Sequence, residues 1–247
     1  MAVAAAAAAD GTHVFLAEWD ASGVRFYQAF DDPIAEWALA HQRFGGPLFD
    51  RSRMTWIKPS FAWVLYRSGY GSKHCQTRVL KVTLPHEVVA RLLAACKCAE
   101  GGRGGGGGAK GRVQWDPARD LMAAEGRVPR RMLRQRAIQI GLAGSLSELY
   151  VESVLAVEDV TPLARAVGAA HGEGSARAVA AALAALSLPL ERPYVPRCDG
   201  DVLHRLRIAP AEAAAGGEMA RSGGGERARA AGEGAGGSYR AGDGTSG

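Results

Sequence analysis

The chain has 247 residues, 47% of them hydrophobic, and a formal net charge of +5. No apolar run approaches the roughly 20 residues of a membrane-spanning helix, and the alanine-rich start lacks the cationic flank of a signal peptide. Four cysteines are too few for the disulfide framework of a small secreted protein. These features predict a cytoplasmic protein with no membrane partner, and they leave its oligomeric state open.

Glycine is concentrated in two tracts, which divide the chain. Of the 33 glycines, eight lie in residues 101–111 and twelve in residues 211–247. Neither tract offers the apolar side chains from which a core is built. We therefore expect an alanine-rich leader at 1–11, one domain at 12–198 with a glycine-rich insertion at 101–111, and a mostly disordered Gly/Ala-rich tail at 199–247.

The first half of this domain begins with a hairpin. Residues 13–19 and 24–30 are predicted strands joined by a turn, and a helix follows from Asp32 with Pro33 at its first position. Pro59 and Ser60 predict the start of a second helix, which should end near Gly69. Residues 76–84 alternate as a strand does.

The second half mixes helices and strands without a regular β-α-β order. A helix is predicted from Pro85 to about Cys98, followed by strands at 112–115, 136–142 and 153–159. Further helices are expected at 145–151, 161–170 and 175–186. The fold class is therefore predicted to be α+β: a single domain of mixed, mainly antiparallel strands with flanking helices.

Positive charge is concentrated between residues 43 and 81. This basic zone holds eight arginines and lysines and only one acidic residue, Asp50. Such a zone predicts an anionic partner, either a nucleotide or a nucleic acid. The alternative is that these cations pair with carboxylates elsewhere in the domain, which would then be an interaction scaffold.

Aromatic residues are interleaved with the cations in residues 53–82. Rings supply stacking surfaces and cations hold phosphates, and a nucleotide site needs both. At least two of Trp56, Phe61 and Trp63 are nevertheless expected in the core. Lys58 and Arg67 interrupt apolar runs, so we expect them to bind phosphate.

The established catalytic and metal motifs are absent from the sequence. It holds no nucleophile elbow, phosphate-binding loop or dinucleotide-binding glycine pattern. Only one residue separates Cys96 from Cys98, whereas two to four residues usually separate paired cysteine ligands in structural zinc sites. No metal site is therefore expected. Asp116, which precedes Pro117, fits a turn cap.

Five segments resemble one family. They are FYQAF (26–30), RMTWIKPSFAWVLYRSGYGSK (53–73), VQWDPARDL (113–121), AIQIGL (137–142) and VEDVTPLA (157–164). They look like the corresponding segments of the family catalogued as domain of unknown function 4291, over roughly residues 15–196. The glycine-rich insertion and both tails depart from that pattern. This resemblance implies no particular activity.

A second similarity is to the ADP-ribosyltransferase superfold. Those enzymes hold NAD with a His or Arg on an early strand and a stacking aromatic, and a later glutamate stabilises the ribosyl cation. By this similarity Gln28 takes the place of the strand residue, Tyr66 that of the aromatic and Glu152 that of the catalytic glutamate. Gln28 departs from the pattern because it is neither His nor Arg, and Glu152 also fits a solvated helix–strand junction.

The leading hypothesis is an NAD-binding, ADP-ribosyltransferase-like enzyme. NAD would be its substrate, Glu152 would be catalytic, and Gln28, Lys58, Tyr66 and Arg67 would bind NAD without a metal. The alternative is a non-enzymatic RNA- or DNA-binding module that uses the basic-aromatic segment 53–82.

Overall fold

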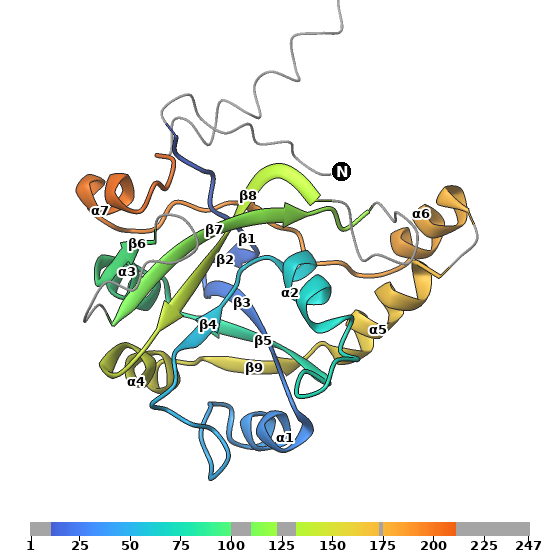
Figure 1. Ribbon diagram of the computed structural model, residues 1–247, viewed down its shortest axis with the longest axis horizontal. Coiled ribbons are helices and arrows are strands. Elements are labelled where there is room, and N and C mark those ends of the chain that lie inside the picture. Colours follow the sequence, from blue (N-terminus) through green and yellow to red (C-terminus); the bar gives the residue numbers. More distant parts are fainter. Residues whose placement is uncertain (1–10, 100–109, 123–131, 173–174, 211–247) are drawn as a thin grey trace, which may run out of the picture.

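A computed structural model describes residues 11–99, 110–122, 132–172 and 175–210. Within these ranges the fold is α+β, with two four-stranded sheets, a two-stranded sheet and helices around them (Figure 1). The predicted fold class is therefore confirmed. The expected leader (but for residue 11), most of the glycine-rich insertion and residues 211–247 of the expected disordered tail lie outside the described residues.

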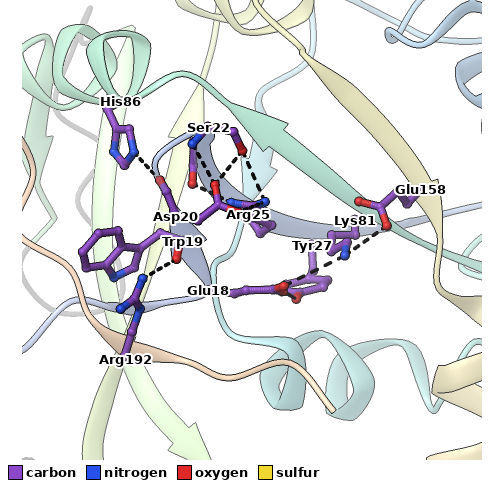
Figure 2. Close-up of polar contacts among 11 residues, drawn as sticks. Glu18, Trp19, Asp20, Ser22, Arg25, Tyr27, Lys81, His86, Glu158 and Arg192 are labelled. Atoms are coloured by element: carbon purple, nitrogen blue, oxygen red, sulfur yellow. Dashed lines mark hydrogen bonds and ion pairs between the residues drawn. The ribbon is translucent and has the colours of Figure 1, made fainter. Parts of the chain in front are cut away.

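The first four-stranded sheet is antiparallel and has the order β2-β3-β5-β9. Its strands are β2 (Trp19–Asp20), β3 (Gly23–Phe30), β5 (Arg78–Leu84) and β9 (Ala156–Asp159). The predicted hairpin forms only beside its turn, where Trp19 and Asp20 oppose Val24 and Gly23; residues 16–17 of the predicted first strand pair with residues 192–193 instead. The Asp20 carboxylate accepts hydrogen bonds from the backbone N–H of Ser22 (2.8 Å) and from the Arg25 side chain (2.6 Å) and so fixes this turn (Figure 2).

The second four-stranded sheet has the order β4-β8-β7-β6. Its strands are β4 (Thr55–Ile57), β8 (Met132–Leu142), β7 (Gly111–Arg119) and β6 (Cys96–Cys98). The two long strands, β7 and β8, extend beyond their predicted bounds. Pro117 lies inside β7, next to an irregularity in its pairing with β8, where a missing N–H is tolerated.

One helix boundary is predicted wrongly. Helix α3 (His86–Ala94) ends at Ala94, and the residues expected to continue it form β6, which pairs parallel with β7. Cys96 is buried against Gly111, where a Cβ atom would lie 2.6 Å from the Cys96 sulfur. This close pairing to a distant strand outweighs local helix propensity.

The remaining helices surround the sheets. They are α1 (Asp32–His41), α2 (Phe61–Ser68), α4 (Ser145–Glu152), α5 (Thr161–Ala170), α6 (Ala176–Ala184) and α7 (Gly200–Arg205). Helices α3 and α4 lie at one end of the sheets, and α5 and α6 at the other (Figure 1). Helix α2 ends as predicted, with Gly69 in the left-handed conformation (φ +58°) that closes its last turn. No described helix is long and apolar enough to cross a membrane.

The packed domain continues past its predicted end at residue 198. Leu206 and Ile208, which follow α7, are buried in the main hydrophobic core. The Trp115 indole N–H donates to the Leu206 carbonyl oxygen over 2.9 Å. A short two-stranded sheet, β1 (Leu16–Ala17) with β10 (Arg192–Pro193), also ties the two ends of the domain together.

A single backbone bridge joins the two four-stranded sheets within the described ranges. Tyr27 on β3 pairs with Lys58, directly after β4, and the Tyr27 N–H donates to the Lys58 carbonyl oxygen over 2.6 Å. This bridge places Lys58 at the junction between the sheets.

Candidate functional site

A cavity of about 860 Å³ lies at this junction. Its walls come from β3, from β4 and the loop before it, from α2, and from the facing strands β7 and β8. Side chains that fit a nucleotide gather there: the rings of Trp56 and Trp63, four glutamines (Gln28, Gln76, Gln114 and Gln139), and the cations Arg53, Lys58 and Arg67.

The loop over residues 42–54 forms part of the cavity wall. Gly46 lies there in the left-handed region (φ +79°), and a Cβ atom at this position would lie 2.8 Å from the Trp37 ring. Phe49 packs its ring against Phe30 and Phe44. These contacts hold the loop against β3 and α1, so the cavity wall is built on buried aromatic packing.

Lys58 is enclosed at one side of the cavity, with only 7% of the residue exposed. Its Nζ lies 3.2 Å from the centre of the Trp63 ring and 3.6 Å from a carboxylate oxygen of Asp116. It also donates a hydrogen bond to the side-chain oxygen of Gln139. Burial lowers the pKa of Lys58 to about 7, against the opposing effect of Asp116 and with a smaller contribution from the positive charge of Arg67.

The facing strands continue this polar chain. Gln114 and Gln139 are paired across β7 and β8, and the Gln139 amide N–H donates to the Gln114 oxygen over 2.6 Å. Because the lysine donates, Gln139 must present its oxygen to Lys58 and its NH₂ to Gln114. The NH₂ group of Gln114 is then available to a ligand acceptor.

Asp116 has a different role from the one predicted. It was expected to cap a turn before Pro117, but it lies within β7, two residues from Gln114 and on the same face. There it forms an ion pair with Lys58. The strand continues through Pro117, so no turn is present for Asp116 to cap.

Gln28 lines the cavity as part of its framework. Its amide N–H donates to the Trp56 carbonyl oxygen over 3.0 Å, and its oxygen accepts a hydrogen bond from the buried Tyr150 hydroxyl. Burial raises the pKa of Tyr150 well above its ordinary value, so this hydroxyl stays a donor. Gln28 thus links β3, β4 and α4.

The other predicted binding and catalytic residues are divided between the cavity and its surroundings. Arg67, exposed in the last turn of α2, lines the cavity. Tyr66 lies outside the cavity lining, and the Arg119 guanidinium covers its ring at 3.7 Å. Glu152 is exposed at the end of α4, also outside that lining. The structure therefore brings Gln28, Lys58 and Arg67 together, but not Tyr66 or Glu152.

Two tryptophans differ from the sequence expectation. At least two of Trp56, Phe61 and Trp63 were expected in the core, but only Phe61 is fully buried. Trp56 and Trp63 are half-buried and line the cavity. The signal that could have found the missed amides is a glutamine inside an apolar strand pattern, as in RVQW and AIQIGL.

The basic zone is split by the fold into paired and unpaired cations. Arg78 pairs with Asp32 and Asp159, while Lys81 lies 3.0 Å from Glu158 and 4.0 Å from Glu18, as Figure 2 shows for the Lys81–Glu158 pair. Glu18 also accepts a hydrogen bond from the buried Tyr27 hydroxyl (Figure 2). The exposed arginines and lysine of the zone, which form no ion pair in the described part of the chain, are Arg43, Arg51, Arg53, Arg67 and Lys73.

Comparison with known families identifies the chain. The model of the family described as "Domain of unknown function (DUF4291)" matches residues 14–194, most of the chain. The chain belongs to the DUF4291 family. The DUF4291 segment contains every residue that lines the cavity. No curated protein matches the chain. In the described part of this DUF4291 protein, no three His, Cys, Asp or Glu side chains are grouped closely enough to hold a metal ion.

Proposed function

We propose that the cavity binds a nucleotide, that this nucleotide is NAD, and that the protein transfers ADP-ribose from it. The observation that carries the proposal is the convergence of two tryptophan rings, a set of glutamine amides and three cations on one cavity. Its volume of about 860 Å³ falls within the range of about 300–1,000 Å³ typical of small-molecule sites.

Each group supplies a different part of nucleotide recognition. Arg53 and Arg67, exposed at the cavity, offer guanidinium groups for the pyrophosphate. Trp56 and Trp63 offer faces for stacking. The Gln114 amide N–H₂ offers a donor pair to the acceptors of a base or of a carboxamide.

ADP-ribosyl transfer also requires a carboxylate near the ribose carbon that becomes positively charged. Glu152 lies outside the cavity lining, whereas Asp31, the residue before α1, lines the cavity. One carboxylate oxygen of Asp31 is buried and makes no hydrogen bond to the described residues. We therefore assign the electrostatic role to Asp31, with Glu152 retained as the competing candidate.

Binding is tested by calorimetric titration of NAD and ADP-ribose into the full chain. Replacing Arg67→Ala removes one charge-assisted contact and should weaken NAD binding by about tenfold or more. The matched control is Arg165→Ala, an exposed arginine on α5 outside the cavity lining, which should leave affinity unchanged. Absence of NAD binding to the wild type would contradict the proposal.

Catalysis is tested by measuring release of nicotinamide from NAD. Removing an electrostatic stabiliser of the transition state typically costs about 10²–10³ in rate. We expect that loss from Asp31→Asn, and little change from Glu152→Gln. The reverse result would restore Glu152 as the catalytic carboxylate.

The second candidate, an RNA- or DNA-binding module, is supported by exposed cations of the basic zone that lie outside the cavity lining. Arg43, Arg51 and Lys73 are exposed and form no ion pair with described residues. A nucleic acid would release one set of counterions per phosphate neutralised, so its affinity would fall steeply with salt. NAD carries only a pyrophosphate, and its affinity should fall much less over the same salt range.

A further inference from the structure

We infer that Lys58 is a nucleophile that bonds covalently to C1 of the ribose in the cavity. This inference rests on the proposed function, because the ribose is that of NAD, and it adds a covalent intermediate to the reaction. The structural basis is a buried amine that lines a ligand-sized cavity and is held by fixed groups.

The surroundings of Lys58 hold its amine in place. The Trp63 ring covers it at 3.2 Å on α2, Gln139 accepts its hydrogen bond on β8, and Asp116 lies 3.6 Å away on β7. The backbone on its N-terminal side is fixed by β4, and its carbonyl oxygen is fixed by the bridge to Tyr27. An amine placed in this way loses little conformational freedom when it reacts.

Burial, which outweighs the attraction of Asp116, favours a neutral amine at Lys58. Asp116 is the acid in contact with it, while Arg67 on α2 adds an opposing positive charge. Arg53 lines the same cavity as a further cation, and Asp31 and Asp50 line it as acids. With a pKa of about 7, a large fraction of Lys58 carries a free electron pair at neutral pH, unlike an ordinary lysine.

The step is a displacement at C1 of the nicotinamide-bearing ribose. The Lys58 Nζ forms a bond to C1 while the C1–nitrogen bond to nicotinamide breaks, and nicotinamide leaves as a neutral molecule with that electron pair. The ammonium formed on Lys58 gives its proton to Asp116. The ribose ring then opens, the ring oxygen takes the remaining N–H proton, and an imine joins C1 to Nζ. Water, acting as the acceptor of the ADP-ribosyl group, hydrolyses the imine to ADP-ribose and free Lys58, and Asp116 releases its proton to solvent.

The first experiment asks whether the amine is reactive, and it needs no nucleotide. The full chain is treated with limiting formaldehyde and cyanoborohydride at pH 7, and methylation is mapped by peptide mass spectrometry. We expect Lys58 to be modified at least about tenfold faster than exposed Lys73, Lys97 and Lys110, because the neutral form of an amine is the one that reacts and burial favours that form at Lys58. Modification of Lys58 at the same rate or more slowly would overturn the inference.

The second experiment traps the intermediate. Incubation with NAD and cyanoborohydride should leave one ADP-ribosyl group on Lys58, fixed as a secondary amine. Lys58→Arg keeps a long basic side chain without the primary amine and should lose this adduct, and the exposed control Lys97→Arg should keep it. Circular dichroism and NAD titration of each variant establish that it is folded and binds NAD.

The outcomes separate the inference from the proposed function. If nicotinamide is released but Lys58 carries no adduct, the nucleophile is wrong and ADP-ribosyl transfer stands. If Lys58 is the fast-reacting lysine but NAD is neither bound nor consumed, the proposed function is wrong, and the bond to its ribose is overturned with it. An adduct spread equally over the lysines of wild type and Lys58→Arg also overturns the inference.

Discussion

Lys58 shows how one residue can be both a structural link and a reactive group. Its backbone carbonyl joins the β3 strand, and its side chain reaches the face of β7 and β8. Burial of a lysine ammonium is costly unless it is paired, and the pairing here is a single carboxylate at 3.6 Å. The pKa of Lys58 is lowered because the attraction of Asp116 offsets only part of the cost of burying the ammonium.

The lowered pKa of Lys58 should be visible in how the stability of the protein depends on pH. The Lys58 pKa is about 7 in the folded state and about 10.4 in the unfolded chain, so between these values the unfolded state binds more protons. Wild type should therefore gain stability relative to Lys58→Met as pH rises from 7 toward 10, by up to about 1.4 kcal/mol per pH unit. Urea unfolding of both proteins at pH 7, 8 and 9 measures the difference. A difference that does not change with pH would contradict the shifted pKa.

The hydrogen bond between Tyr150 and Gln28 should contribute measurably to stability. Tyr150→Phe keeps the ring but leaves the buried Gln28 oxygen without its donor, which costs about 1–3 kcal/mol. Tyr66→Phe is the control, because Tyr66 is half-buried and its hydroxyl makes no hydrogen bond to the described residues. Chemical unfolding should separate the two variants, and equal stabilities would argue against this hydrogen bond.

At the scale of elements, the sequence predicted correctly those helices whose bounds are set by residues within the helix. Helix α5 begins and ends as predicted, since Pro162 and the spacing of its apolar residues lie within the helix itself. Strand β6 was missed because its partner, β7, is more than a dozen residues away, beyond the glycine-rich tract. The candidate site follows the same pattern. Lys58 and Arg67 lie in one conspicuous segment, but Gln114, Asp116 and Gln139 come together only when β7 pairs with β8.

Helix α7 and the residues after it should be required for stability, although the sequence placed them in the tail. Leu206→Ala removes a fully buried side chain and should cost about 2–5 kcal/mol of unfolding free energy. Leu203→Ala, at a half-buried position on α7, should cost less. Thermal and urea unfolding measure both. A neutral Leu206→Ala would mean that the domain ends where the sequence predicted.

At the scale of the whole molecule, the cavity lies between two four-stranded sheets, each with its own set of hydrogen-bonded strands. A ligand there contacts both, because β3 and β4 line one part of the cavity and β7 and β8 another. Such a ligand adds its binding free energy to the stability of the folded state alone.

NAD should therefore stabilise the whole domain. At 100 times its dissociation constant, a ligand of the folded state adds about 2.7 kcal/mol to the unfolding free energy. Hydrogen exchange should slow in β3 and in β8 together, since the ligand spans the two sheets. Protection confined to one sheet, or an unchanged melting temperature, would argue against this cavity as the binding site.

The bridge between Tyr27 and Lys58 has a consequence for any mutational survey of this protein. Because Lys58 spans the seam between the sheets, a shift of one sheet against the other displaces its amine relative to its own backbone. We therefore expect substitutions that disturb the packing between the sheets, even far from the cavity, to change the pKa and the reactivity of the Lys58 amine. The pKa or the labelling rate of the Lys58 amine therefore reports how well the two four-stranded sheets pack against each other.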